Sequence, residues 1–165
     1  MVICDPSYVT GQEKTKVTGR VIRAICIMDH PIPNTNNAQS IQIILPQKQM
    51  GRKTDIYISM VSAAHNVCRQ GLYLAICSAT VETNDPQAEL KPAMDLIGET
   101  LDVFIQISEI HEPCNDSKAE GLFVTSSYDA TSHFETAGDQ ILDMYEQIAG
   151  EKLVFNIQPS EEDEY

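Results

Sequence analysis

The sequence RVIRAICIMD, residues 20–29, has apolar side chains on both of the faces that a β-strand presents. One face carries Val21, Ile25 and Ile27, and the other carries Ile22, Ala24, Cys26 and Met28. Alternate side chains of a strand point to opposite faces, so this run predicts a strand that is covered on both sides within a sheet.

Three further strand patterns follow this run on short connections, at residues 40–45, 55–61 and 72–81. Gly51 permits a tight reversal in the connection between the first two. The third run, LYLAICSATV, is rich in the apolar and β-branched residues that are typical of strands. Consecutive strands on short links predict an antiparallel meander.

The second half of the chain mixes helix and strand patterns. Asp85 and Pro86 form a helix-start signal. Pro92 then predicts either a kinked helix or two short helices, because an interior proline costs ~3 kcal/mol. Residues 102–110 alternate like a half-exposed strand, and residues 122–128 predict the last strand of the sheet.

The apolar residues take helical spacing from Gln140 onward, and Gly150 stands where a glycine commonly ends a helix. A chain of 165 residues, 42% of them hydrophobic, is long enough for one domain with its own core. Together these patterns predict an α+β fold, related to α/β folds, with an antiparallel-rich sheet and a closing C-terminal helix.

Composition limits the class of protein and its partners. The formal charge of −13 argues against binding to nucleic acid or to anionic membrane, since both require clustered Lys and Arg. No run reaches the ~18 apolar residues of a membrane span, and the N-terminus lacks a secretory signal. We therefore expect a cytoplasmic protein without stable membrane insertion. The five cysteines contain no Cys-x-x-Cys pair, which argues against a zinc site.

Residues 127–136, SYDATSHFET, gather hydroxyl, carboxylate and imidazole groups where a strand pattern gives way to a helix pattern. A hydrolase site is one interpretation, but neighbouring side chains diverge and no Gly-x-Ser-x-Gly elbow is present. The favoured interpretation is a strand-to-helix turn with side-chain caps, made by Tyr128, Asp129, Thr131 and His133. We therefore predict no catalytic residue and no enzyme activity.

The remaining motifs point away from a bound cofactor. The histidines have no His-x-x-x-His or His-x-Glu spacing, and the glycines form no phosphate-binding motif. We predict neither a metal nor a cofactor.

Arg52 and Lys53, with Lys48 nearby, form the compact basic cluster of this acidic chain, in a connection expected to be exposed. A solvated turn accounts for it, and a contact to an acidic partner patch is the functional alternative.

Several longer runs, taken in order, resemble one known family. They are CDPSY at 4–8, VIRAICI at 21–27, HPIPNTN at 30–36, QIILPQ at 42–47, GRKTDIY at 51–57, AHNV at 64–67 and SYDATSHFET at 127–136. These runs resemble the C-terminal part of the Rab GDP dissociation inhibitors. The resemblance implies that residues 1–156 form the C-terminal portion of such a domain and that residues 157–165 are an acidic tail.

The resemblance implies a protein that binds GDP-bound, prenylated Rab GTPases, slows GDP release and recycles Rab between membranes and cytosol in vesicle transport. It also implies part of a large domain related to flavin-dependent oxidases. In the family, much of the Rab-binding platform and the lipid-binding domain lie upstream of the matched region, so this chain is expected to act as a scaffold part. Rab escort proteins, which assist Rab prenylation, and a remnant of a flavin-dependent oxidoreductase are the alternatives.

Overall fold

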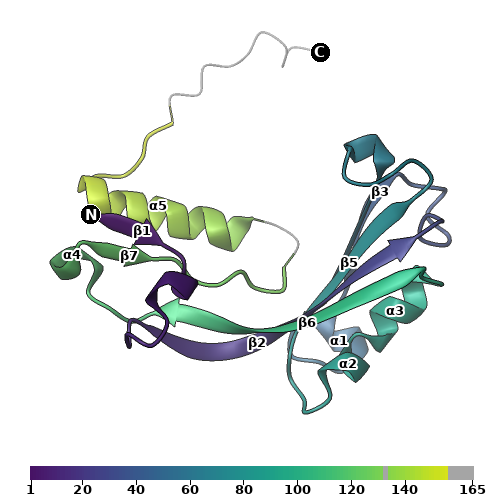
Figure 1. Cartoon of the computed structure of the whole chain (residues 1–165), viewed down its shortest axis with the longest axis horizontal. Helices are drawn as coiled ribbons and strands as arrows, with labels where there is room; N and C mark the ends of the chain where they lie inside the picture. Colours follow the sequence, from purple (N-terminus) through teal and green to yellow (C-terminus); the bar gives the residue numbers. More distant parts are fainter. Residues whose placement is uncertain (132–133, 156–165) are drawn as a thin grey trace, which may run out of the picture.

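The computed structural model of the chain describes residues 1–131 and 134–155. Within this part, the chain forms a five-stranded sheet and a separate two-stranded sheet (Figure 1). Two long paired strands of the larger sheet form a ribbon that extends from the rest of this sheet towards the two-stranded sheet (Figure 1). The described residues include no helix with the length and apolar content needed to span a membrane.

All neighbouring strands in the larger sheet are antiparallel, in the order β3-β4-β5-β2-β6. Their bounds are Thr15–Met28 for β2, Ser40–Leu45 for β3, Ile56–Ser62 for β4, Tyr73–Thr80 for β5 and Asp102–Pro113 for β6. The predicted meander is confirmed as β3-β4-β5, and residues 20–29 fall in β2, between β5 and β6. The α+β class with an antiparallel-rich sheet is likewise confirmed.

Two short helices cover one face of this sheet, α2 at Pro86–Glu89 and α3 at Lys91–Ile97. Pro92 lies in the first turn of α3, where its missing N–H removes no intrahelical hydrogen bond, so the chain forms two helices rather than one kinked helix. Asp85 caps α2 by accepting a hydrogen bond from Ala88 N at 3.2 Å. The core between the helices and the sheet includes Ile22, Ala24, Cys26, Ile58, Cys77, Leu90 and Ile97.

The opposite face of β2 is covered only in part. The expected strand with cover on both sides is confirmed at Val21, which is 1% exposed, but not at Ile25. Ile22 is fully buried under the helices, whereas Ile25 on the other face is 41% exposed. The chain crosses this face over Arg23 and Ser78, through residues 128–131, and leaves the neighbouring Ile25 open. An apolar pattern reports a tendency to be buried, but it does not supply the element that does the burying.

The edge strand β6 is also more exposed than its alternation suggests. Phe104 is 55% exposed on one face, and Ile105 and Ile107 are 46% and 44% exposed on the other. A long apolar edge strand is unusual in an isolated domain, because its open backbone groups invite pairing with another chain.

The smaller sheet pairs β1, Val2–Cys4, with β7, Leu122–Val124, in parallel. The prediction that residues 122–128 form the last strand of the main sheet is therefore wrong. After three residues the chain leaves β7 and crosses to the main sheet. There Ser127 N donates a 2.9 Å backbone hydrogen bond to the carbonyl oxygen of His111 in β6, and side chains of β2 and β5 hold the residues that follow.

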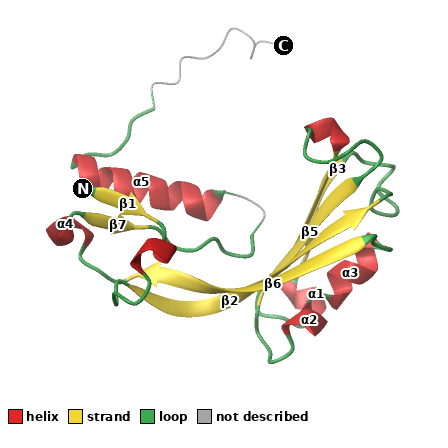
Figure 2. Cartoon of the chain, in the orientation of Figure 1, coloured by secondary structure: helices red, strands yellow, loops and turns green. Residues whose placement is uncertain are grey.

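The C-terminal helix α5 spans Glu135–Ala149 and lies alongside β1 and β7 (Figure 2). It begins before the predicted Gln140 and ends, as predicted, at Gly150, whose φ is 81°. Four short helices complete the described fold: Pro6–Val9, α1 at Gln47–Met50, Ala63–His65 and α4 at Ser117–Glu120. The acidic tail at 157–165 lies outside the described residues.

Candidate functional site

The turn at residues 128–131 lies on the open face of the main sheet and is held there by two side chains from it. Arg23 Nη2 donates hydrogen bonds to the carbonyl oxygens of Tyr128, at 3.2 Å, and of Asp129. Ser78 Oγ donates a buried hydrogen bond of 2.6 Å to the carbonyl oxygen of Ala130. Arg23 and Ser78 are direct partners across β2 and β5, so the sheet presents both donors side by side.

Asp129 organises the turn internally. Its Oδ1 accepts hydrogen bonds from Thr131 N at 2.8 Å and from Thr131 Oγ1 at 2.5 Å. Its Oδ2 accepts one from the hydroxyl of Thr136 at 3.1 Å, in the first turn of α5. The first pair of bonds is the pattern by which Asp closes a tight turn on its own backbone, and the last links the turn to the helix.

The four residues predicted for this turn have different placements. Asp129 and Thr131 are brought together, whereas Tyr128 is 78% exposed and contributes its carbonyl oxygen to the turn. His133 lies outside the described residues. The expected side-chain cap is not observed at the N-cap position of α5, which is occupied by Phe134, because a phenyl ring has no acceptor.

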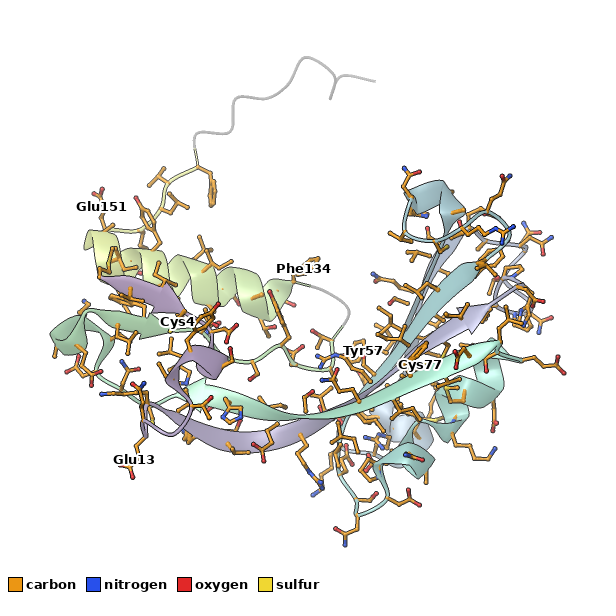
Figure 3. All side chains as sticks on the ribbon, in the orientation of Figure 1. Cys4, Glu13, Tyr57, Cys77, Phe134 and Glu151 are labelled. Atoms are coloured by element: carbon orange, nitrogen blue, oxygen red, sulfur yellow. The ribbon has the colours of Figure 1, made fainter. Side chains whose placement is uncertain are left out.

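A shallow pocket of about 260 Å³ opens beside the turn. Figure 3 shows Tyr57 where the segment before α5 meets the sheet. The pocket is lined by Gln47, Lys53, Thr54, Asp55, Tyr57, Thr80, Asp129, Ala130 and Thr131. Burial, together with the nearby carboxylates of Asp55 and Asp129, raises the pKa of Tyr57. The phenol is therefore a hydrogen-bonding group at neutral pH, not a base.

The described residues contain no cluster of three or more His, Cys, Asp or Glu side chains able to hold a metal ion. Cys26 and Cys77 lie buried in the core, and the hydrogen bond between them, together with burial, raises the pKa of the Cys77 thiol. A thiol of this kind behaves as a small apolar core group, not as a nucleophile.

Arg52 forms a second polar cluster at the same end of the sheet. Its guanidinium contacts Glu89 at 2.7 Å and Glu82 at 3.5 Å, and it donates to the carbonyl oxygen of Thr80 at 2.7 Å. The side chains of Arg52 and Glu89 are only 10% and 4% exposed. Arg52 thus joins the connection before β4 to the end of β5 and to α2.

The expectation that Arg52 is solvent-exposed is wrong, and Lys53 is the exposed member of the pair. The backbone N–H of Lys53 donates to the carboxylate of Glu82, at 3.0 Å to the nearer oxygen, and Lys53 is one of the residues that line the pocket. Nothing in the sequence spacing signals that Arg52 pairs with carboxylates 30 and more residues away. Whether either residue contacts a partner stays a prediction.

Ser78→Ala should test how firmly the turn is anchored. The variant leaves the buried carbonyl of Ala130 without its donor, which should lower the free energy of unfolding by about 1–3 kcal/mol and loosen residues 128–131. Urea denaturation and limited proteolysis measure these two effects. Ser59→Ala, a half-buried serine on the neighbouring β4, is the matched control. An equal loss in both variants would contradict an anchoring role for Ser78.

Comparison with known proteins gives a consistent result. The family described as GDP dissociation inhibitor matches residues 1–160. A Rab GDP-dissociation inhibitor from Saccharomyces cerevisiae is 50% identical over 163 residues, which is 98% of this chain and 36% of that protein. A probable secretory pathway GDP dissociation inhibitor 1 from Schizosaccharomyces pombe is 47% identical over 99% of this chain and 37% of its own length.

The fold comparison agrees with the sequence comparison. The crystal structure of a Rab GDI from Plasmodium falciparum superimposes with a TM-score of 0.90 at 50% identity. The match covers 93% of this chain and 35% of that one. The chain therefore spans little more than a third of the length of the relatives it matches.

Proposed function

Because this chain belongs to the GDP dissociation inhibitor family, we propose that it serves as the scaffold portion of a Rab GDP dissociation inhibitor. Such a protein binds GDP-bound, prenylated Rab GTPases, slows their release of GDP and carries them between membranes and cytosol during vesicle transport. Shielding a prenyl group is a physical requirement of that cycle, since each buried methylene contributes about 0.8 kcal/mol that would otherwise favour the bilayer. The match along residues 1–160 carries the proposal.

The polar clusters support a role in architecture. Arg23, Ser78 and Asp129 direct their hydrogen bonds to backbone groups and to hydroxyls of the same chain. Arg52 is likewise occupied by Glu89 and Thr80. Groups held in this way position elements, so we propose that the chain regulates by binding and is not an enzyme.

The exposed apolar surface supports a requirement for a complementary polypeptide. Along α5, Ile141 is 65% exposed, and the apolar faces of β6 are open as well. The parallel sheet of β1 and β7 has only two strands, whereas parallel sheets normally contain more strands and are covered on both faces. We propose that the regions of the family that this chain does not span cover these surfaces in the functional assembly.

A GDP-release assay on prenylated Rab tests the proposal. This chain alone should leave the release rate unchanged. Adding a fragment equivalent to the part of the Saccharomyces cerevisiae relative that the chain does not match should slow release by about tenfold, in the range of typical coupling between binding sites. The fragment without this chain is the control. Full inhibition by the fragment alone, or none by the pair, would contradict the scaffold role.

The same assay examines the basic cluster. Lys53 is the exposed member, so we propose it, rather than Arg52, as the contact to an acidic partner patch. Lys53→Glu in the reconstituted pair should slow the association of the pair with Rab and reduce the salt dependence of that association rate. Charges at the rim of an interface act mainly on this rate. Lys91→Glu, at an exposed position of α3, controls for a general effect of charge.

Two alternatives have their own tests. A Rab escort protein would support prenylation of newly made Rab, whereas an inhibitor extracts Rab that is already prenylated. A flavin-dependent oxidoreductase portion would bind flavin, and a shared fold does not by itself imply that chemistry. Flavin absorbance in the purified protein would favour this second alternative.

A further inference from the structure

His30 stands just after β2, at the start of the loop that leads to β3. Both nitrogens of its imidazole ring lie at hydrogen-bond distance from backbone carbonyl oxygens. Nδ1 is 2.8 Å from the carbonyl oxygen of Pro31, and Nε2 is 2.9 Å from that of Glu99. The second contact joins segments that are 69 residues apart in the chain.

A carbonyl oxygen only accepts hydrogen bonds, so each of these contacts needs an N–H on the ring. A neutral imidazole has one N–H and therefore satisfies one carbonyl, leaving a nitrogen lone pair directed at the oxygen of the other. The imidazolium ion has two N–H groups and satisfies both. Both contacts are therefore hydrogen bonds only when His30 is protonated, and the geometry favours the imidazolium ion.

The charged groups acting on the ring favour the same state. Asp29 lies on its own segment and Glu99 on the link between α3 and β6, and both are carboxylates. The hydrogen bond to the Pro31 carbonyl raises the pKa of His30 most, and burial lowers it. The hydrogen bond to the Glu99 carbonyl and the two carboxylates raise the pKa further. The net result is a pKa for His30 above its usual value.

The surroundings show what this contact holds in place. Gly98, with φ at 87°, lies against the ring, where an added Cβ would come within 3.4 Å of the imidazole Cε1. In the loop between β2 and β3, Ile32 is buried in the core, and its carbonyl oxygen accepts a 2.6 Å hydrogen bond from Thr35 Oγ1. His30 therefore joins a loop seated on the core to the link that leads into the edge strand β6.

We propose that His30 is a proton-dependent clamp between the β2–β3 loop and the α3–β6 link. When protonated, it donates to Pro31 and Glu99 together and holds the two segments to each other. When neutral, it releases one of them. The direction follows from linkage: a group whose pKa is raised by folding stabilises the fold below its unfolded pKa of about 6.5, and that stabilisation is lost as the pH rises through the folded pKa.

Nuclear magnetic resonance of the unmodified full chain tests the clamp directly. Long-range ¹H–¹⁵N correlations of the imidazole rings report whether one or both nitrogens carry a proton, and His30→Gln assigns the signal. His30 should titrate above about pH 6.5. The backbone amides of Ile32 and Leu101, on the two clamped segments, should shift with the same midpoint.

Thermal unfolding of the variants provides a second readout. Between about pH 5.5 and pH 8.5, the melting temperature of the unmodified chain should fall by about 2 °C more than that of His30→Gln, because the glutamine does not titrate. His65→Gln, at an exposed position in the short helix Ala63–His65, should keep the full pH dependence. A titration of His30 at or below pH 6.5, or equal pH dependence in all three proteins, would overturn the proposal.

Discussion

Arg52→Ala is expected to lower the free energy of unfolding by about 3–5 kcal/mol, among the largest losses available from a single charged residue in this chain. The variant leaves Glu89, only 4% exposed, as a buried carboxylate without its cation. It also removes the donor to the carbonyl oxygen of Thr80. Urea denaturation followed by circular dichroism measures the change.

The local environment explains why this ion pair differs from those at the surface. Glu89 also accepts hydrogen bonds from Thr83 N at 2.7 Å, from Thr83 Oγ1 at 2.8 Å and from Glu82 N at 3.0 Å. Burial by itself raises the pKa of Glu89, but the bonds from Thr83, Arg52 and Glu82 outweigh it, so the pKa lies below its usual value. The ionised carboxylate is therefore the form that the fold selects.

The pH dependence provides a signature of this mechanism. A carboxylate whose pKa is lowered by folding contributes stability above its unfolded pKa of about 4.3, and that contribution is lost as the pH falls through the folded pKa. The difference in stability between the unmodified chain and Arg52→Ala should therefore shrink in acid. A difference that is constant with pH would contradict the role given to Glu89.

Two controls separate the ion pair from other effects of the substitution. Lys91→Ala breaks an exposed pair with Asp95, whose side chains are 72% and 62% exposed, and should change stability by less than about 0.5 kcal/mol. Arg52→Met combined with Glu89→Gln removes both charges and keeps an acceptor for Thr83. This double variant should recover much of the loss, since the main penalty is the uncompensated charge.

Ile22→Ala is the second substitution with a large expected effect, a loss of about 2–5 kcal/mol in the free energy of unfolding. Ile22 is fully buried in β2, in the core that α2 and α3 cover. Removing its side chain leaves a cavity that the paired strands β5 and β6 on either side of β2 prevent from collapsing.

Ile25→Ala is the matched control, because it removes the same atoms from the same strand. Ile25 lies on the opposite face and is 41% exposed, so its loss should be about 1 kcal/mol or less. Similar losses from the two variants would show that the second face of β2 is covered in solution. In the reconstituted assembly with the complementary fragment, the cost of Ile25→Ala should rise if that fragment covers this face.

Much of the fold follows from local patterns. The meander of β3, β4 and β5 was predictable because alternation and β-branched content act over a few residues, and its short links leave little choice of topology. An interruption near Pro92 was predictable because proline cannot lie in a helix interior at low cost, and the structure shows that it takes the form of two helices, not of a kink. The family could be predicted for a different reason, since long runs in register are specific even where no single motif is.

The errors arose where a local pattern has more than one tertiary outcome. The run at 122–128 suits a strand, but its partner is the distant β1, and only three residues pair. The connection containing Arg52 reads as a polar surface turn, yet it folds onto Glu89 and Thr80. Neither contact leaves a signal in the sequence spacing, because the residues involved are far apart in the chain.

The sequence by itself determined the strands of the meander, the end of α5 at Gly150 and the family of the chain, because each depends on short-range propensity or on matching residues in order. Only the tertiary structure decided which face of β2 is buried, which residues anchor the turn at 128–131 and which side chain neutralises Glu89. The physical reason is that burial and charge pairing belong to contacts between distant segments. An amino-acid pattern indicates that a side chain tends to be buried or to pair with an opposite charge. The fold determines whether a distant segment provides that burial or that charge.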